Sequence, residues 1–148
     1  MKIFIGSDHA GVELKAAIIK HLAKAEMKAE DLGPFSANSV DYPDYAHTVC
    51  LEVLSAPKNS FGILICGSGN GINMSANKHQ EIRSALCWEP EIASLSRQHN
   101  DANVIALPAR FISEKKALKI IDAFLDAEFE GGRHQNRVNK IAIDFDEE

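Results

Sequence analysis

A short apolar run that leads directly into a glycine-rich loop constrains the fold of this chain most strongly. Residues 61–66 read Phe-Gly-Ile-Leu-Ile-Cys, and residues 67–71 read Gly-Ser-Gly-Asn-Gly. The run does not alternate apolar and polar residues, which is typical of a strand covered on both faces. The glycines leave successive N–H groups free to point at a ligand. The segment therefore predicts a buried strand that ends with a thiol, Cys66, beside an anion-binding loop.

Apolar strands alternate with helical patterns along the chain. The expected strands are residues 3–5, 28–32, 61–66, 83–87 and 103–107. Helices are expected over residues 12–23, 41–53, 90–99 and 113–125, with another after the glycine loop through residue 78. Parallel strands need crossover connections, which helices usually supply. The pattern predicts an α/β fold, a three-layer α/β/α sandwich of the Rossmann-like type around a five-stranded parallel sheet. It leaves the strand order open.

The helical spacing also predicts which side chains face the core. In the first helix these are Val12, Ala16, Ile19, Leu22 and Ala23. In the last long helix, which Ser113 caps, they are Ala117, Ile120, Ile121, Phe124 and Leu125. Cys50 and Cys87 fall in the apolar patterns of a helix and a strand, and we expect both to be small core residues.

Length, charge and cysteine spacing exclude several classes of protein. The 148 residues, 45% of them hydrophobic, predict one domain over residues 1–148. A net charge of −5 argues against a nucleic-acid surface. The three cysteines lack Cys-x-x-Cys spacing, which argues against disulfides or structural zinc and favours the cytoplasm. No apolar run approaches the roughly 20 residues of a membrane span. We expect a soluble, unprocessed chain with a solvated acidic end at residues 144–148.

Polar residues follow the first expected strand. Residues 6–11 resemble a dinucleotide-binding fingerprint, and Glu30 or Asp31 falls where a ribose-binding acid would lie. A carboxylate at Asp8 would repel a pyrophosphate, which argues against a nicotinamide-dependent oxidoreductase. Asp8 and His9 instead place a carboxylate and an imidazole where ligands of α/β proteins collect. Asp8 also suits a helix cap, and both interpretations stay open.

A basic group near the C-terminus is the second candidate for ligand binding. Arg133 and Arg137 share one face if they lie on a helix, where their guanidinium groups could clamp a phosphate beside His134. The alternative is a solvated basic face. Arg110, just after the fifth expected strand, is a further candidate at the sheet edge that carries Cys66.

A dense polar connection precedes the fifth expected strand. It contains His99 and Asn100, and the histidine suggests chemistry more strongly than the turn-forming residues beside it. A zinc site formed by Cys66, Cys87, His9 and His99 is conceivable, but no pair has ligand spacing, so no metal is expected.

Five motifs, in order along almost the whole chain, together resemble ribose-5-phosphate isomerase of type B. They are residues 6–11 (Gly-Ser-Asp-His-Ala-Gly), 41–43 (Asp-Tyr-Pro), 66–71 (Cys-Gly-Ser-Gly-Asn-Gly), 96–101 (Ser-Arg-Gln-His-Asn-Asp) and 130–134 (Glu-Gly-Gly-Arg-His). The resemblance implies interconversion of D-ribose 5-phosphate and D-ribulose 5-phosphate through an enediolate, without metal or cofactor. Relatives in that family isomerise allose or galactose 6-phosphate, which keeps those substrates open. A sugar-phosphate sensor that performs no catalysis is a further alternative.

The resemblance also assigns roles to residues. Cys66 would be the base that removes the C2 proton, His99 would open the sugar ring, and Ser68 would move a proton between O1 and O2. Part of the family uses a glutamate directly after the glycine loop as the base, but Ile72 occupies that position here. The substrate-binding residues implied are Asp8, His9, Tyr42, Gly67, Ser68, Gly69, Asn70, Gly71, Asn100, Arg110, Arg133, His134 and Arg137, with the phosphate ligands at His9, Arg110 and in the segment 130–148.

Assembly follows from the same resemblance. The family builds its site between two subunits, with His99 and Asn100 facing the Cys66 loop of the other chain. A homodimer, or a pair of such dimers, is therefore implied. Trp88, Phe111 and Phe129 could lie in such an interface, although core burial explains each of them equally well.

Overall fold

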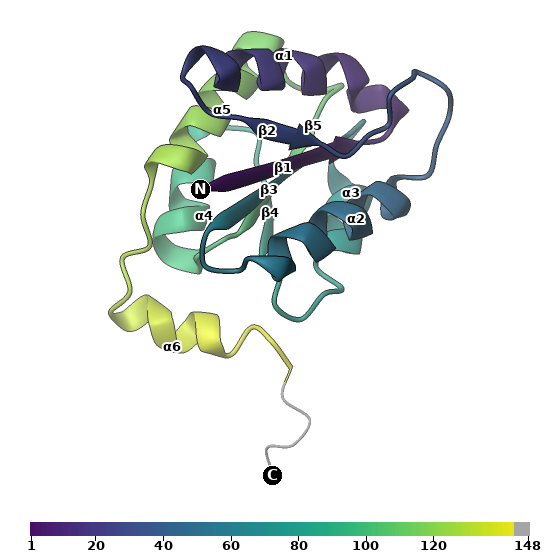
Figure 1. Cartoon of the computed structure of the whole chain (residues 1–148). Coiled ribbons are helices and arrows are strands. Elements are labelled where there is room, and N and C mark those ends of the chain that lie inside the picture. The colour runs from purple at the N-terminus through teal and green to yellow at the C-terminus, as the bar shows by residue number, and fades with distance from the viewer. Residues whose placement is uncertain (144–148) are drawn as a thin grey trace.

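The computed structural model describes residues 1–143 and consists of a parallel sheet between two layers of helices (Figure 1). The strands are β1 (Lys2–Ser7), β2 (Ala29–Asp31), β3 (Ser60–Cys66), β4 (Ser84–Leu86) and β5 (Val104–Pro108). The helices are α1 (Val12–Lys24), α2 (Tyr42–Ser55), α3 (Asn70–Ala76), α4 (Pro90–Asn100), α5 (Glu114–Asp126) and α6 (Arg133–Asn139), with a short 3₁₀ turn, η1 (His9–Gly11), before α1. The predicted three-layer sandwich with a five-stranded parallel sheet is confirmed.

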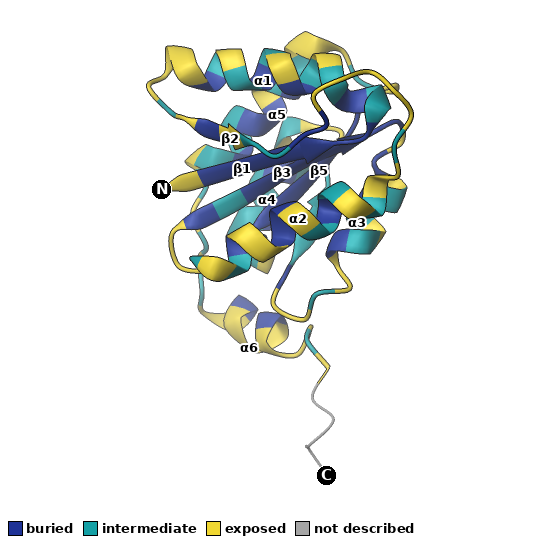
Figure 2. Cartoon of the chain, turned by 45° about the vertical axis from the view of Figure 1, so that its right-hand side comes forward, coloured by how far each residue is buried: buried dark blue, intermediate teal, exposed yellow. Residues whose placement is uncertain are grey.

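The three central strands, β1, β3 and β5, are buried on both faces, as their unalternating apolar residues predicted. Ile63 and Ile65 of β3 face the core beneath α1, α4 and α5, whereas Leu64 and Cys66 face the core beneath α2 and α3. Figure 2 shows the central strands β1, β3 and β5 as a largely buried band between partly exposed helices. Burying apolar side chains on both faces supplies the main driving force for folding.

The strand order β2-β1-β3-β5-β4 places a topological switch between β1 and β3. From β1 the chain crosses to β2 on one side of the sheet, and then returns to β3 on the other side. Ser7 at the end of β1 pairs with Ile65 near the end of β3. Asp8 and Cys66, the residues that follow, therefore lie at adjacent carboxyl ends, where open α/β sheets bind ligands.

Most expected elements are present, with local differences. Pro90 opens α4, and the Ser113 hydroxyl caps α5 by accepting from the Lys116 N–H at 3.1 Å. The helix after the glycine loop ends at Ala76, so its expected continuation through residue 78 is wrong.

The predicted buried face of α1 is partly wrong. Ala16 and Ala23 are exposed, whereas Lys15 is buried together with Ile18 and Leu22. The Lys15 ammonium donates to Asp31 Oδ1 at 2.6 Å and to the Pro34 carbonyl oxygen at 2.7 Å. Because these acceptors satisfy the buried charge, the lysine replaces an apolar residue on that face. Asp31, one of the two acids placed where a ribose-binding residue would lie, forms an ion pair with Lys15 in this structure.

Core burial is the wrong interpretation for two of the three large aromatic residues left open above. Trp88 is 50% exposed and Phe111 is 75% exposed, whereas Phe129 is half-buried. The helix prediction for α5 is correct, since Ala117, Ile120, Ile121 and Phe124 are all buried. Within residues 1–143, no helix combines the length and apolarity needed to span a membrane. The acidic segment 144–148 lies outside the described residues.

A histidine pair joins α2 to the segment between α3 and β4. His47 Nδ1 and His79 Nε2 lie 2.8 Å apart, close enough for one ring to donate a hydrogen bond to the other. Loss of water around His79 and the nearby charge of His47 lower the pKa of His79 below its usual value. The folded chain therefore favours a neutral His79, and the contact is lost if both rings carry a proton.

We predict that this pair makes stability depend on pH. The pKa of His79 is lower when folded than when unfolded, so the unfolded chain binds more protons as the pH falls below about 6.5. The free energy of unfolding should then decrease, and His79→Gln should show a smaller decrease. Denaturant titrations across this pH range test the difference, with His21→Gln as a control at a histidine paired with Asp122. Equal losses in the wild type and His79→Gln would contradict the prediction.

Candidate active site

Cys66 ends β3 at the switch between β1 and β3, and the residue is only 4% exposed. The N–H of Gly69 donates to its Sγ at 3.2 Å. The sulfur thus lies at the carboxyl end of β3, where α/β sheets bind ligands, with a backbone N–H directed at it.

The loop after Cys66 requires glycine. Gly69 has a left-handed backbone with φ of 77°, and a Cβ there would lie 3.2 Å from the carbonyl carbon of Leu107. The N–H of Asn70, the first residue of α3, donates to the Ser68 hydroxyl at 3.3 Å. This tight turn keeps the Ser68 hydroxyl and the backbone of residues 67–71 at the same edge of the sheet as Cys66.

Asp8 lies directly beside this loop. Its N–H donates to the Ile65 carbonyl oxygen at 3.0 Å, and its side chain is largely buried. Oδ1 accepts from the Ala10 N–H at 2.9 Å, so Asp8 does cap η1, one of the two interpretations left open. One carboxylate oxygen is sufficient for the cap, which leaves the other able to accept from a ligand hydroxyl.

His9 is oriented by a backbone contact. Its Nδ1 accepts from the Val40 N–H at 3.2 Å. A neutral ring that accepts at Nδ1 carries its proton on Nε2. His9 can therefore donate a hydrogen bond from Nε2 to an anion.

Tyr42 and Arg110 cover the glycine loop from two directions. The Tyr42 ring occupies the space that a side chain at position 71 would need, so Gly71 allows the close approach of α2. The Arg110 N–H donates to the Gly67 carbonyl oxygen at 3.0 Å. Its guanidinium Nη1 lies 3.2 Å from the point where a Cβ of residue 67 would stand. A cation and an aromatic ring thus border the loop that carries Cys66.

The remaining predicted residues form a second group at the other end of the fold. His99 and Asn100 end α4, which runs from the carboxyl end of β4 back to the amino end of β5. Asp101 then adopts a left-handed φ of 48° and accepts from Arg97 at 3.1 Å, which ends the helix. Because α4 runs antiparallel to the strands, His99 and Asn100 lie at the edge of the sheet opposite Cys66. Within one chain the predicted site is therefore divided.

The second group continues onto α6, which packs beside α4 and away from the sheet (Figures 1 and 2). Arg133 and Arg137 both lie on α6, so the condition under which they share one face of a helix is met. The rings of His99 and His134 stack with centroids 4.2 Å apart and an interplanar angle of 12°. Burial lowers the pKa of His134, and the charges of His99, Arg133 and Arg137 lower it further, whereas Glu130 opposes them.

Glu130 also belongs to this group, although the motif at residues 130–134 predicted no role for it. Its Oε1 lies 3.7 Å from Nε2 of both His99 and His134. The spacing of four residues between Glu130 and His134 could have indicated the second contact, but the first joins segments far apart in the sequence.

The other two cysteines are core residues, as predicted. Cys50 and Cys87 are fully buried, and burial raises the pKa of each thiol to about 12. They therefore remain protonated and have little reactivity near neutral pH.

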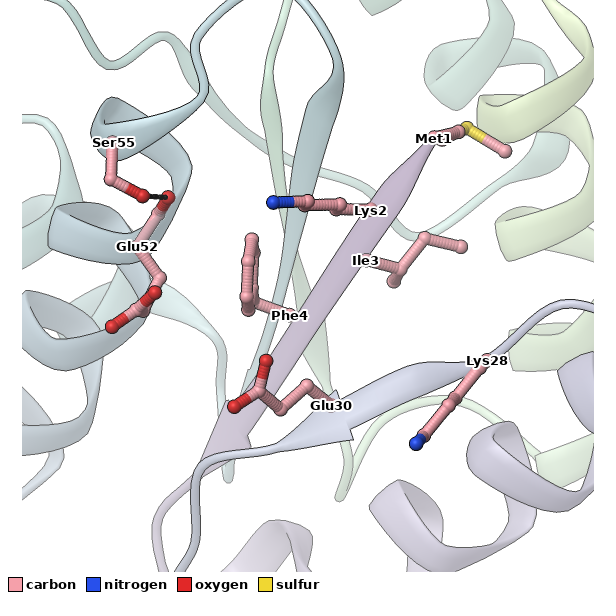
Figure 3. Close-up of a pocket in the computed structure, with 8 residues that line it drawn as sticks. All are labelled: Met1, Lys2, Ile3, Phe4, Lys28, Glu30, Glu52 and Ser55. Carbon is pink, nitrogen blue, oxygen red and sulfur yellow. Dashed lines mark hydrogen bonds between the residues drawn. The ribbon is translucent and has the colours of Figure 1, made fainter.

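A large hollow lies apart from both groups of predicted residues. It has a volume of about 620 Å³ and lies at the amino end of β1, between β2 and the end of α2 (Figure 3). Its charged lining residues are Lys2, Lys28, Glu30 and Glu52. None of its lining residues is a histidine or a cysteine, so Cys66 and His99 define better candidates for chemistry.

Comparison with known proteins agrees with the geometry. Residues 3–141 match the family described as Ribose/Galactose Isomerase. A probable ribose-5-phosphate isomerase B of Mycoplasma pneumoniae is 49% identical over 140 residues, which cover 94% of this chain and 91% of that protein. The ribose-5-phosphate isomerase B of Escherichia coli is 47% identical, with 95% and 93% covered.

Solved structures show the same fold. A ribose 5-phosphate isomerase of Thermotoga maritima superposes with a TM-score of 0.92 at 47% identity, covering 95% of this chain and 97% of that one. The ribose-5-phosphate isomerase B of Mycoplasma genitalium with bound ribulose-5-phosphate also gives a TM-score of 0.92, at 45% identity, with 95% and 93% covered. The chain therefore belongs to the ribose/galactose isomerase family and groups with the enzymes named ribose-5-phosphate isomerase B, as its motifs predicted.

Proposed function

We propose that this chain is an aldose–ketose isomerase that interconverts D-ribose 5-phosphate and D-ribulose 5-phosphate, a step of the non-oxidative branch of the pentose phosphate pathway. The observation that carries the proposal is the Cys66 thiol, which lies at the sheet switch point, accepts from a backbone N–H and adjoins Asp8. The relatives named above support the substrate. The three free cysteines suit a reducing compartment, so we place the activity in the cytoplasm. We assign it to one isomerase domain over residues 1–148.

Cys66 is the base in this proposal. Its thiolate takes the proton from C2 of the open-chain aldose, and the electron pair of that bond forms the C1–C2 double bond of an enediolate. The proton then returns to C1 while Ser68 moves a proton between O1 and O2. Ile72, which is fully buried and apolar, cannot accept a proton in place of a glutamate.

The glycine loop stabilises the charge that develops on the enediolate oxygen. The N–H groups of Gly69 and Asn70 donate to Cys66 and Ser68, which fixes the turn, and the other N–H groups of residues 67–71 are the proposed donors to that oxygen. The Arg110 guanidinium lies over the same loop. Fixed donors in a partly buried site stabilise a transition state without reorganisation. Asp8 and Tyr42 border this space and would hold the sugar hydroxyls.

Ring opening and phosphate binding need the second group, which one chain keeps at the opposite edge of its sheet. We infer that two chains associate as a homodimer, so that His99 and Asn100 of each chain face the Cys66 loop of its partner. Arg133, His134 and Arg137 would then bind the phosphate together with His9 and Arg110. A C₂ dimer completes both sites at once, because the same contact occurs twice.

The substrate is tested by comparing turnover of five- and six-carbon aldose phosphates. We expect kcat/KM for D-ribose 5-phosphate to exceed that for allose 6-phosphate and galactose 6-phosphate by at least tenfold, as one or two favourable contacts would give. Preference for a six-carbon sugar would assign the chain to the alternative substrates. Binding of ribose 5-phosphate without formation of ribulose 5-phosphate would instead indicate a sensor.

Replacement of Cys66 tests its role as the base. Cys66→Ala should lower kcat for ribose 5-phosphate by about 10²- to 10⁴-fold, the usual contribution of a general base, while substrate binding is retained. Cys50→Ala is the matched control, because Cys50 is buried within α2 and should leave turnover unchanged. Near wild-type turnover by Cys66→Ala would contradict the proposal.

A further inference from the structure

Three metal-binding side chains converge where α4 ends and α6 begins. His99, Glu130 and His134 each bring one ligand atom, and these atoms all lie within 4.8 Å of one another. Both imidazole Nε2 atoms lie 3.7 Å from the same carboxylate oxygen. That separation is longer than a hydrogen bond, and within residues 1–143 neither ring makes one.

The spacing is close to that of a tetrahedral metal site. Zinc binds histidine nitrogen and carboxylate oxygen at about 2.0–2.2 Å, so two ligand atoms of one tetrahedral ion lie roughly 3.3 Å apart. The 3.7 Å separations need to shorten by a few tenths of an ångström. Because the two rings are stacked with an interplanar angle of 12°, one imidazole must also rotate out of the stack to direct its lone pair at the same ion. Two imidazoles and one carboxylate form a ligand set that zinc accepts, with a fourth position left for water.

The backbone holds the three residues in place before any ion binds. The Glu130 N–H donates to the Gln98 carbonyl oxygen at 3.0 Å, which fixes Glu130 beside the residue that precedes His99. The His134 N–H donates to the Gly131 carbonyl oxygen at 3.0 Å and starts α6. Preformed placement lowers the entropy lost when the ligands are ordered around an ion.

The site is open on one side. The side chains of His99 and Glu130 are 39% and 52% exposed, so an ion could enter from solvent. Arg133 and Arg137 lie near His134 and repel a cation. Binding should therefore be weaker than at a closed structural zinc site.

We propose that His99, Glu130 and His134 bind a divalent transition-metal ion of the zinc type, and that the ion inhibits the enzyme by removing both histidines from the substrate. The binding claim is independent of the reaction, whereas the inhibition claim rests on the proposed function. The ion is not a cofactor of the isomerisation, and its release restores the free imidazoles.

Titration of the purified protein with Co²⁺, followed by visible absorption, tests the site directly. The wild type should bind one ion per chain with the spectrum of tetrahedral cobalt. Glu130→Gln and His134→Gln should each weaken binding at least tenfold, since loss of even an outer-shell partner costs 10- to 100-fold. His47→Gln, in the other histidine pair, and Cys66→Ala should bind as the wild type does. Absence of binding, or binding that is lost in Cys66→Ala but kept in Glu130→Gln, would overturn the site.

Zinc inhibition tests the second half of the proposal. Zn²⁺ should reduce isomerisation of ribose 5-phosphate by the wild type, a chelator should restore it, and Glu130→Gln should need at least tenfold more Zn²⁺ for half-inhibition. Cobalt binding without zinc inhibition would overturn the claim that the ion competes with substrate. If the chain has no isomerase activity, the proposed function fails, and the cobalt titration still decides the site.

Discussion

The structure depends on one constraint, which is that β3 is buried on both faces yet must end at the surface. Its apolar side chains pack against helices on either side of the sheet, so its direction and position are fixed by most of the core. The strand then stops at Cys66, where glycines turn the backbone sharply into α3. The packing of this strand therefore fixes the position of the thiol at the switch point, as the proposed role of Cys66 as a base requires.

Because the helices run antiparallel to the strands, the candidate site residues lie at two opposite edges of the sheet. Parallel strands oblige each connecting helix to run back, so residues that end a helix lie opposite residues that end a strand. Cys66, Asp8 and Arg110 follow strands, whereas His99 ends a helix and Arg137 lies on α6 beside it. The division is therefore a consequence of the topology, and a second chain is the simplest means of joining the two groups.

Much of the fold could be predicted because its signals are local. Unbroken apolar runs predicted the central strands β1, β3 and β5, whereas mixed segments gave only weaker signals for β2 and β4. The cap at Ser113 and the proline at position 90 predicted two helix starts. The burial of Lys15 could not be predicted, because its partner Asp31 is 16 residues away. Strand order was also inaccessible, since it depends on which way each crossover turns.

The candidate site was predicted less completely than the fold. Its residue types came from a resemblance to a known family, and the structure places Cys66, Asp8 and Arg110 near one another at the carboxyl ends of their strands. The contact of Glu130 with His99 depends on how the segment after α5 folds back onto α4, which no local pattern encodes. The exposure of Trp88 and Phe111 was equally unpredictable, because aromatic residues are usual in cores.

The central claim, that each active site combines Cys66 of one chain with His99 of another, is tested most directly by mixing two inactive variants. Cys66→Ala and His99→Asn would be purified separately, unfolded together, refolded, and assayed with ribose 5-phosphate. Random pairing makes half of the dimers mixed, and each mixed dimer has one intact site, so activity should recover to about one quarter of the wild-type value. A mixture as inactive as its components would contradict the shared site.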